Sequence, residues 1–259
     1  EAGGARRLTP GTLGPGQAEY LEALFEREIL PTLTPIAVSP RRRFPLLAEK
    51  ELALAVEVRG PGKKRRIAVV AVPRGVPRLV HLPSNSGVEF ILLEDVIRRH
   101  LPALFQGYSV RDVCVFRTTR DADLSVEEER DEDFASLMGE VLRRRRRNSI
   151  VRLEVEADAP KRLVDLLARR LAVSTEDTCA VPGPLDLRGF FELVGVPALS
   201  ALREPEWQPR PSPDLPPEAD LWQTLRSRDV LLHHPYDSFD PVVRLVVEAA
   251  EDPSVLAIK

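Results

Sequence analysis

The sequence predicts an α+β domain followed by the start of an incomplete α/β domain. Apolar residues alternate with a period of two in the first third of the chain, which indicates strands. Further along, strand-like stretches alternate with amphipathic stretches of helical period, as in βα units. A proline-rich segment then separates this region from a final βαβ pattern. These three observations give the fold class and the order of the domains.

The composition is that of an ordinary globular protein, with 259 residues, 43% hydrophobic and 30% charged. No apolar run approaches the roughly 20 residues of a membrane helix, and residues 1–15 lack the apolar core of a signal peptide. We therefore expect a soluble protein with a cytoplasmic location. The chain does not begin with Met and stops after the strand-like residues 255–258, so we expect a piece of a longer protein.

The two cysteines, Cys114 and Cys179, lie far apart, and neither belongs to a CxxC motif or a Cys/His cluster. This pattern favours free, buried thiols in a reducing compartment, with a disulfide or a reactive thiol as the alternative. It excludes a structural zinc site built on cysteine.

The first half of the chain combines helices with an antiparallel strand pair. Residues 17–29 carry apolar side chains at helical spacing, and Pro31 prevents the helix from continuing. Residues 52–58 and 67–72 are two apolar runs on either side of a Gly-Pro-Gly turn, which predicts an antiparallel pair. The further elements expected are a strand at 79–82, a helix at 93–104, a strand at 113–117 and a helix at 125–142, which opens with a capping box.

The second half continues with βα alternation and then changes character. The expected elements are a strand at 150–155, a helix at 160–171, a strand at 178–181 and a helix at 187–194. Residues 204–217 contain six prolines, which deny the segment both helical and central-strand hydrogen bonding and indicate a semi-rigid linker. After it come a strand at 229–233, a helix at 241–250 and a strand at 255–258, which together predict one βαβ unit.

Five segments, taken in this order, resemble the long-chain polyphosphate kinase family. They are residues 28–38 (EILPTLTPIAV), 90–97 (FILLEDVI), 116–124 (FRTTRDADL), 151–156 (VRLEVE) and 231–240 (LLHHPYDSFD). The resemblance covers nearly the whole chain from about Leu8 onward. Because several separate motifs agree in order, the resemblance is specific.

The resemblance implies a domain organisation. Residues 1–40 correspond to the end of a helical N-terminal domain, and residues 41–203 to the complete α+β head, or middle, domain. Residues 204–217 are the linker. Residues 218–259 correspond to the first βαβ unit of a phospholipase-D-like catalytic domain, which is truncated here.

The resemblance also implies a reaction. The family transfers the γ-phosphate of ATP to an enzyme histidine and then to the end of inorganic polyphosphate, reversibly and with magnesium. The nucleophilic histidine lies beyond Lys259, and none of the four histidines of this chain matches it. We therefore expect this chain alone to be inactive and to bind neither ATP nor magnesium by itself. The longer parent is expected to use ATP, ADP and polyphosphate and to form a homo-oligomer, a dimer or higher, and its association with a membrane stays open.

Three residues are candidates for lying near phosphate: His234, Ser238 and Lys259. His234 stands at the end of an expected strand, where ligands gather in parallel α/β sheets. Its neighbour His233 would point to the opposite face, which argues against joint metal chelation. Ser238 or Asp240 is expected as the N-cap of the following helix, whose start suits phosphate. Capping alone would select the same residues, so both interpretations stay open.

The run Arg143, Arg144, Arg145, Arg146 and Arg147 follows the apolar stripe of the helix expected at 125–142. Cations are favourable at a helix C-terminus, and five in succession must also face solvent. The run is therefore either a solvated helix end or a contact for polyphosphate or a partner subunit. With only 5% aromatic residues the chain lacks stacking platforms, which disfavours binding of nucleic acid.

Three functional hypotheses follow from these patterns. The first is a part of a polyphosphate kinase. The second is a non-enzymatic dimerisation module, because the resemblance implies assembly through the head domain. The third is a basic module that binds polyanions or RNA through the arginine run. The sequence contains no Gly-rich P-loop, and the acidic residues 121–129 are explained by helix capping better than by a metal site.

Overall fold

The computed structural model describes residues 4–39, 44–60, 64–85, 87–121 and 149–257. The chain divides into two compact units, residues 1–202 and 203–259. The helix predicted at 125–142, the arginine run Arg143 to Arg147 and Lys259 lie outside the described residues.

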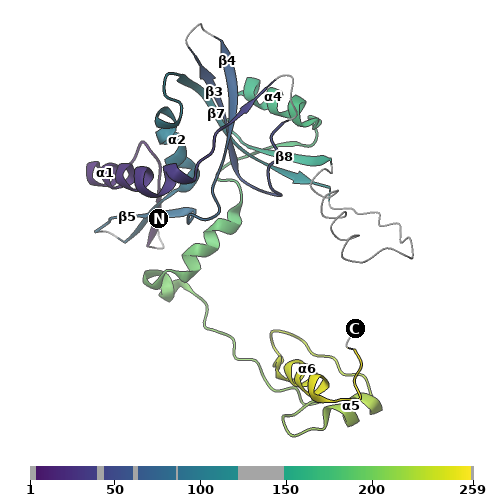
Figure 1. The fold of residues 1–259 in the computed structure, drawn as a ribbon. Helices are drawn as coiled ribbons and strands as arrows, with labels where there is room; N and C mark the ends of the chain where they lie inside the picture. Colours follow the sequence, from purple (N-terminus) through teal and green to yellow (C-terminus); the bar gives the residue numbers. More distant parts are fainter. Residues whose placement is uncertain (1–3, 40–43, 61–63, 86, 122–148, 258–259) are drawn as a thin grey trace. The chain divides into compact units, whose positions relative to one another are not determined.

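The first unit is built on a six-stranded sheet (Figure 1). Its spatial order is β2 (Ile36–Val38), β4 (Arg65–Ala71), β3 (Ala53–Arg59), β7 (Ser109–Arg120), β8 (Ile150–Glu156) and β9 (Thr178–Val181). The predicted antiparallel pair is confirmed as β3 and β4, in register from Ala53 opposite Ala71 to Arg59 opposite Arg65. Only β8 and β9 of this sheet run parallel, and α4 (Lys161–Leu171) connects them, because a parallel pair needs a crossover.

A smaller sheet contains β1 (Ala5–Leu8), β6 (Val88–Leu92) and β5 (Leu79–Leu82) in that order. β1 pairs in parallel with β6, and β5 pairs with β6 in antiparallel register. β6 leads directly into the helix α2 (Leu93–Leu104), which confirms the prediction for residues 93–104.

The helix predicted at residues 17–29 is present with two kinds of turn. It begins as α1 (Pro15–Leu24) and continues as a π-helical segment, Phe25–Ile29. A 3₁₀ turn, Leu30–Thr32, follows and contains Pro31, which cannot donate the hydrogen bond that would extend the helix.

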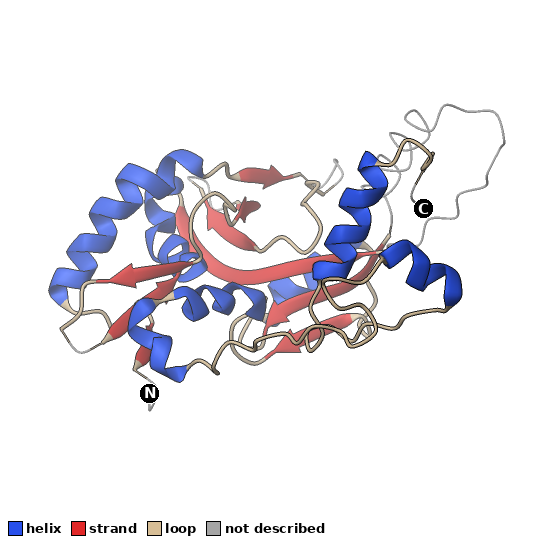
Figure 2. Ribbon diagram, turned by 90° about the horizontal axis from the view of Figure 1, so that it is seen from below, coloured by secondary structure: helices blue, strands red, loops and turns tan. Residues whose placement is uncertain are grey.

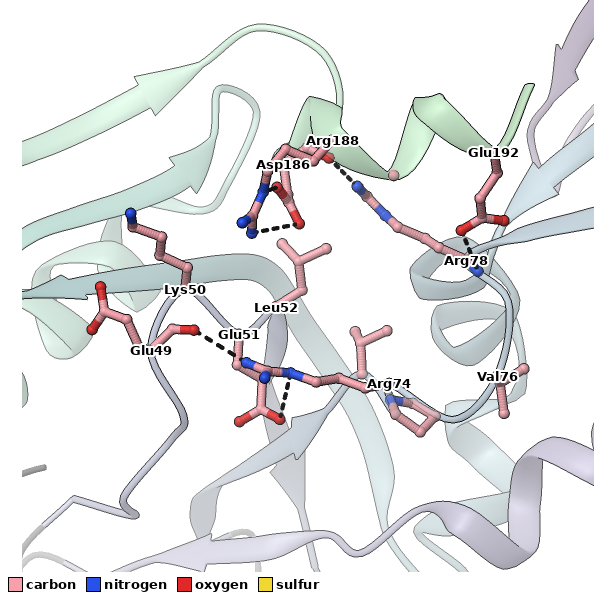
Figure 3. A pocket seen from close by; sticks show the side chains of 13 residues that line it. Glu49, Lys50, Glu51, Leu52, Arg74, Val76, Arg78, Asp186, Arg188 and Glu192 are labelled. Carbon is pink, nitrogen blue, oxygen red and sulfur yellow. Dashed lines mark hydrogen bonds and ion pairs between the residues drawn. The ribbon is translucent and has the colours of Figure 1, made fainter. Parts of the chain in front are cut away.

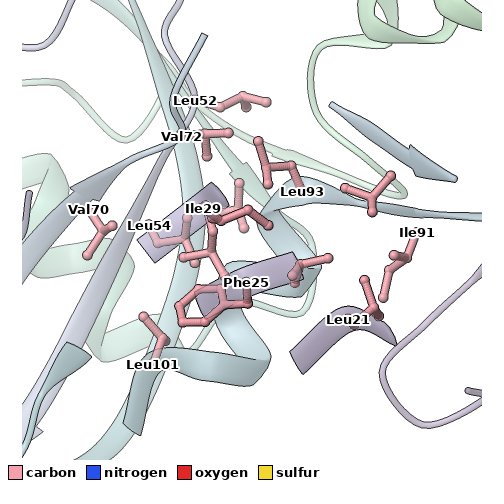
Figure 4. Close-up of a cluster of buried hydrophobic side chains, with 14 of the residues drawn as sticks. Leu21, Phe25, Ile29, Leu52, Leu54, Val70, Val72, Ile91, Leu93 and Leu101 are labelled. Atoms are coloured by element: carbon pink, nitrogen blue, oxygen red, sulfur yellow. The ribbon is translucent and has the colours of Figure 1, made fainter. Parts of the chain in front are cut away.

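The inner strands β3 and β4 of the large sheet are buried on both faces, so their side chains divide into two apolar clusters. On β3, Leu54 and Val56 face one cluster with α1 and α2, where Leu21, Phe25 and Leu101 also lie (Figure 4). Ala53 and Ala55 face the other cluster, formed with α4. This follows from the pleat of a strand, which sends successive side chains to opposite faces.

Phe25 joins the π-helical segment to α2. Its side chain is 1% exposed and stacks on His100 with ring centroids 4.3 Å apart. The Nδ1 atom of His100 lies 2.8 Å from the carbonyl of Val96 and its Nε2 atom lies 3.2 Å from Glu22. His100 therefore has a packing role, as is usual for a lone histidine beside apolar residues.

A buried ion pair ties three segments of the first unit together. Arg78, just before β5, donates to Glu94 in α2 at 2.6 Å. The same guanidinium donates to the carbonyl of Leu185 at 2.5 Å and to the carbonyl of Asp186. These carbonyls precede a 3₁₀ helix, Leu187–Gly195, where the sequence predicted a helix at 187–194. A second 3₁₀ segment, Pro197–Leu202, ends the unit.

The second unit contains α5 (Leu221–Ser227) and α6 (Asp240–Glu251), drawn in blue in Figure 2. Part of the proline-rich segment is fixed to α6, because Arg244 donates to the carbonyls of Pro217 at 2.8 Å and Ala219 at 2.9 Å. In the part of the chain that the structure describes, no helix is both long and apolar enough to cross a membrane.

Of the βαβ unit predicted after the linker, the described residues show the helix and neither strand. Residues 229–233 and 255–257 contain no strand, so α6 stands without the two flanking strands. An extended segment becomes a strand only when a neighbouring backbone pairs with it. Within residues 203–257 the pairing that occurs is an isolated bridge between Arg210 and Asp237, which leaves residues 229–233 without a partner strand. The phospholipase-D-like beginning of residues 218–259 therefore stays a prediction.

The packing of Phe25 leads to a stability prediction. Phe25→Ala should lower the free energy of unfolding by about 3–5 kcal/mol, because it removes a fully buried ring and leaves a cavity beside His100. Tyr20→Ala in α1 is the matched control, because Tyr20 is 41% exposed. Urea denaturation followed by circular dichroism measures both variants. Equal losses would contradict this assignment of the core.

A second prediction concerns Gly189. A Cβ atom at this position would lie 2.9 Å from the Cδ and Nη1 atoms of Arg78, closer than packing allows. Gly189→Ala should therefore destabilise the first unit by roughly 1–3 kcal/mol. Gly195, in the same 3₁₀ helix, has no neighbour within 4 Å of such an atom. Gly195→Ala should unfold at the same urea concentration as the parent chain or slightly higher, and an equal loss in both variants would exclude the proposed steric cause.

Candidate functional site

Residues 233–239 of the second unit form a closed loop that contains two of the predicted site residues. The N–H of Asp237 donates to the carbonyl of His233 at 2.9 Å. In return, the carboxylate of Asp237 accepts the N–H of His233 at 2.8 Å. These reciprocal bonds close the turn on itself and fix the positions of His234 and Ser238.

The loop is held against residues 207–212 of the proline-rich segment. The N–H of Arg210 donates to the carbonyl of Tyr236, and the N–H of Ser238 donates to the carbonyl of Arg210, both at 2.8 Å. The rings of Trp207 and Tyr236 lie edge to face with centroids 5.2 Å apart. A large part of this segment therefore supports the loop rather than only linking the two units.

One ring nitrogen of His234 makes a hydrogen bond within the loop, which leaves the other ring nitrogen to interact with a ligand. Its Nδ1 atom lies 3.0 Å from the carbonyl oxygen of Asp237. A carbonyl oxygen only accepts hydrogen bonds, so Nδ1 carries the proton and Nε2 is the nitrogen without it. The exposed ring packs edge to face on Phe239 at 5.0 Å, whereas His233 packs on Tyr236 at 4.9 Å. The two imidazoles thus have different ring partners.

Ser238 does not have the capping position that the sequence indicated. The N-cap of α6 is Phe239, not Ser238 or Asp240, and its side chain makes no capping hydrogen bond. The hydroxyl of Ser238 accepts the N–H of Asp240 at 3.1 Å. Pro241 has no N–H, and the N–H of Val242 donates to Phe239 at 3.0 Å. Because the first turn satisfies its own donors, an anion here would be bound by side chains.

The structure thus brings His234 and Ser238 together on one loop. It leaves their grouping with Lys259, and the contacts of Arg143 to Arg147, untested, because these residues lie outside the described part.

The described residues contain no group of three or more His, Cys, Asp or Glu side chains that could hold a metal ion. Both cysteines are free thiols, and Cys114 is buried as expected, whereas Cys179 is only partly buried. Burial raises the pKa of the Cys114 thiol to about 12, so Cys114 is protonated and unreactive at neutral pH.

A cleft in the first unit was not anticipated from the sequence. Its volume is about 480 Å³. Residues 49–52, 72–78 and 186–192 supply its lining, and Figure 3 shows Lys50, Arg74 and Arg188 approaching from three different segments. No local motif marks it, because its side chains come from positions up to 143 residues apart, from Glu49 to Glu192.

Charged side chains organise one wall of the cleft. Burial tends to raise the pKa of Asp186. The hydrogen bond and charge of Arg188, with the further charges of Arg117 and Arg78, outweigh this effect, so the pKa of Asp186 is lowered. The hydrogen bond that Arg188 donates to Asp186 in turn raises the pKa of Arg188. Arg117 also lowers the pKa of Glu154, against the effect of burial. Asp186 and Arg188 in this wall are therefore both ionised at neutral pH.

Both units of the chain match domains of known proteins. The polyphosphate kinase middle domain matches residues 16–193, and the polyphosphate kinase C-terminal domain 1 matches residues 220–259. A protein of Bacillus cereus named polyphosphate kinase is 40% identical over 100% of this chain and 38% of its own length. One of Pseudomonas aeruginosa with the same name is 37% identical over 93% of this chain and 36% of its own length.

A solved structure gives the same result. The crystal structure of polyphosphate kinase from Porphyromonas gingivalis superposes with a TM-score of 0.69, at 27% identity, over 96% of this chain and 36% of that chain. This chain therefore spans little more than a third of the length of the relatives that it matches. With two domain matches in order and relatives aligned along its whole length, the chain belongs to the polyphosphate kinase family.

Proposed function

We propose that this chain is part of an ATP:polyphosphate phosphotransferase, which builds inorganic polyphosphate from the γ-phosphate of ATP. The observation that carries the proposal is the match of both domains in order, together with relatives named polyphosphate kinase that align with the whole chain. The free thiols accord with a reducing, cytoplasmic location.

The proposed reaction has two reversible steps. In the first, a histidine nitrogen forms a bond to the γ-phosphorus while the bond to the β,γ-bridging oxygen breaks and ADP leaves. In the second, a terminal phosphate oxygen of the polyphosphate attacks that phosphorus and releases the histidine. None of the four histidines here corresponds to this nucleophile, so we place it in the part of the longer protein after residue 259.

Magnesium would supply charge neutralisation on the phosphates. We assign its binding to none of the described residues, because they contain no cluster of ligands for it. This chain would contribute contacts for assembly and for the path of the substrate.

His234, Ser238 and Lys259 are the proposed residues near phosphate. His234 is exposed, and its ring is oriented by the bond from Nδ1 to the carbonyl of Asp237. The hydroxyl of Ser238 is on the same loop. The ammonium of Lys259 would act as a mobile point charge toward a phosphate.

The test uses the longer protein, with polyphosphate synthesis from ATP as the measurement. Lys259→Ala should lower the rate at low ionic strength by about 10-fold, which corresponds to roughly 1.4 kcal/mol of lost transition-state stabilisation. Lys161→Ala is the control, because Lys161 is 86% exposed on α4 and pairs with Asp165. The chain of 259 residues alone should make no polyphosphate.

Two results would contradict the proposal. Polyphosphate synthesis by residues 1–259 alone, in proportion to protein concentration, would place the nucleophile within this chain. Equal rates for the two lysine variants, both folded, would remove Lys259 from the phosphate site.

A second role, self-association, is favoured by exposed apolar side chains near the end of the first unit. Leu187, Phe191, Val194 and Leu202 are all exposed, with Phe191 at 76%. Such a stripe indicates an interaction surface rather than a core.

Sedimentation of the 259-residue chain at micromolar concentration tests this role. We expect a dimer or a higher oligomer, which Phe191→Ser should weaken by about 10-fold, the effect of roughly 1.4 kcal/mol of lost contact. A monomer at all concentrations would contradict the assembly role.

A further inference from the structure

The cleft of the first unit carries hydrogen-bond donors that its own carboxylates do not use. Each of its four carboxylates is already bound within the fold. Glu192 accepts the N–H groups of Arg78 and Leu79, both at 3.3 Å. Asp186 accepts from Arg117 at 3.0 Å and from Arg188 at 2.8 Å.

The other two carboxylates are bound to backbone. Glu51 accepts the N–H of Ala48 at 2.9 Å, and Glu49 accepts the N–H of Arg120 at 3.1 Å. The acidic groups of the cleft therefore serve to fix its walls.

The cationic side chains Lys50, Arg74 and Arg188 use few of their hydrogen-bond donors within the fold. Arg74 is 64% exposed, donates one hydrogen bond to the carbonyl of Glu49 at 3.1 Å and lies 4.0 Å from Glu51. Arg188 is 67% exposed and pairs with Asp186 alone among the described residues. Lys50 has no ion pair to any described residue. An arginine has five N–H donors and a lysine three, so most donors that line the cleft remain available.

The backbone of the cleft is also unusual. Lys50 has φ of 55° and Asp186 has φ of 50°, both in the left-handed region. Among the described non-glycine residues, the third such position is Ala172, which is the C-cap of α4. Conformations of this kind gather at ligand sites, where the surrounding structure holds them. Here the N–H of Lys50 donates to Thr118, and the carbonyl of Asp186 accepts from Arg78.

We propose that this cleft binds an inorganic oligophosphate through Lys50, Arg74 and Arg188. The excess of donors selects an anion, and the volume of about 480 Å³ is that of a small-ligand site. The choice of oligophosphate among anions rests on the proposed function. No aromatic residue lines the cleft, so nothing there would stack on the base of a nucleotide.

The buried Arg78 gives this site a rigid floor. Its guanidinium binds Glu94 and the carbonyls of residues 185 and 186, so Asp186 and Arg188 are held on a fixed segment. A preformed site binds a charged ligand without first ordering its own walls.

The experiment is a calorimetric titration of the 259-residue chain with tripolyphosphate at low ionic strength, beside a titration with ATP. Tripolyphosphate should bind at one site, and more tightly than ATP. Lys50→Gln and Arg74→Gln should each weaken it at least about fivefold, because each removes a charge-assisted contact from an exposed side chain and leaves the core intact. Lys161→Gln on α4 should leave the affinity unchanged.

Several outcomes would overturn the assignment. They are the absence of binding, equal weakening by Lys161→Gln, or unchanged affinity in both cleft variants. Tighter binding of ATP with the same sensitivity to Lys50→Gln would make the cleft a nucleotide site instead. The proposed function is tested separately. The longer protein can synthesise polyphosphate even if this chain binds no tripolyphosphate, and this chain can bind tripolyphosphate even if the longer protein synthesises no polyphosphate.

Discussion

The burial of β3 on both faces is the constraint on which the first unit depends. Its apolar side chains alternate between two clusters, so neither face of the sheet can stay open to water. The α1 and α2 helices cover one face, and α4 covers the other. Because α4 is also the crossover between β8 and β9, the same helix closes the core and creates the parallel pair.

One residue of β3 breaks this apolar pattern. Glu57 is buried among the strands, and Arg65, 3.4 Å away, and Arg162 of α4 pair with it. A carboxylate out of water is tolerated only when it is paired, so α4 contributes charge as well as apolar contact to this face. The pair of Arg78 and Glu94 has a comparable role at the other end of the unit. Buried ion pairs of this kind add little net stability, but they do fix which segments meet.

The sequence predicted best the elements whose pattern is local. The alternation in β3 and β4 and the helical spacing in α2 and α4 each identify an element without reference to the rest of the fold. β1 is the opposite case, because its sequence, Ala-Arg-Arg-Leu, has no alternation and it is a strand only through its pairing with β6. Strands were expected at 229–233 and 255–258, and the described residues 229–233 and 255–257 are not strands, for the related reason that apolar segments need a partner to become strands.

The two candidate sites also differ in whether a local sequence pattern could reveal them. His234 and Ser238 lie within one short motif, so the sequence could group them, although it could not show that Phe239 is the N-cap. The cleft is formed by Lys50, Arg74 and Arg188, which the folding of the sheet and of the Arg78 anchor brings together. Only the described fold reveals that its carboxylates are bound within the fold, whereas most donors of Lys50, Arg74 and Arg188 are not.

The edges of the large sheet have a consequence for the behaviour of the chain in solution. The outermost strands, β2 and β9, are three and four residues long, whereas the inner strands run from seven to twelve. A short edge exposes few unpaired N–H and C=O groups, so it is a poor template for the addition of a foreign strand. The two-sided apolar strands, which would aggregate readily if they stood at an edge, are thereby kept in the interior of the sheet.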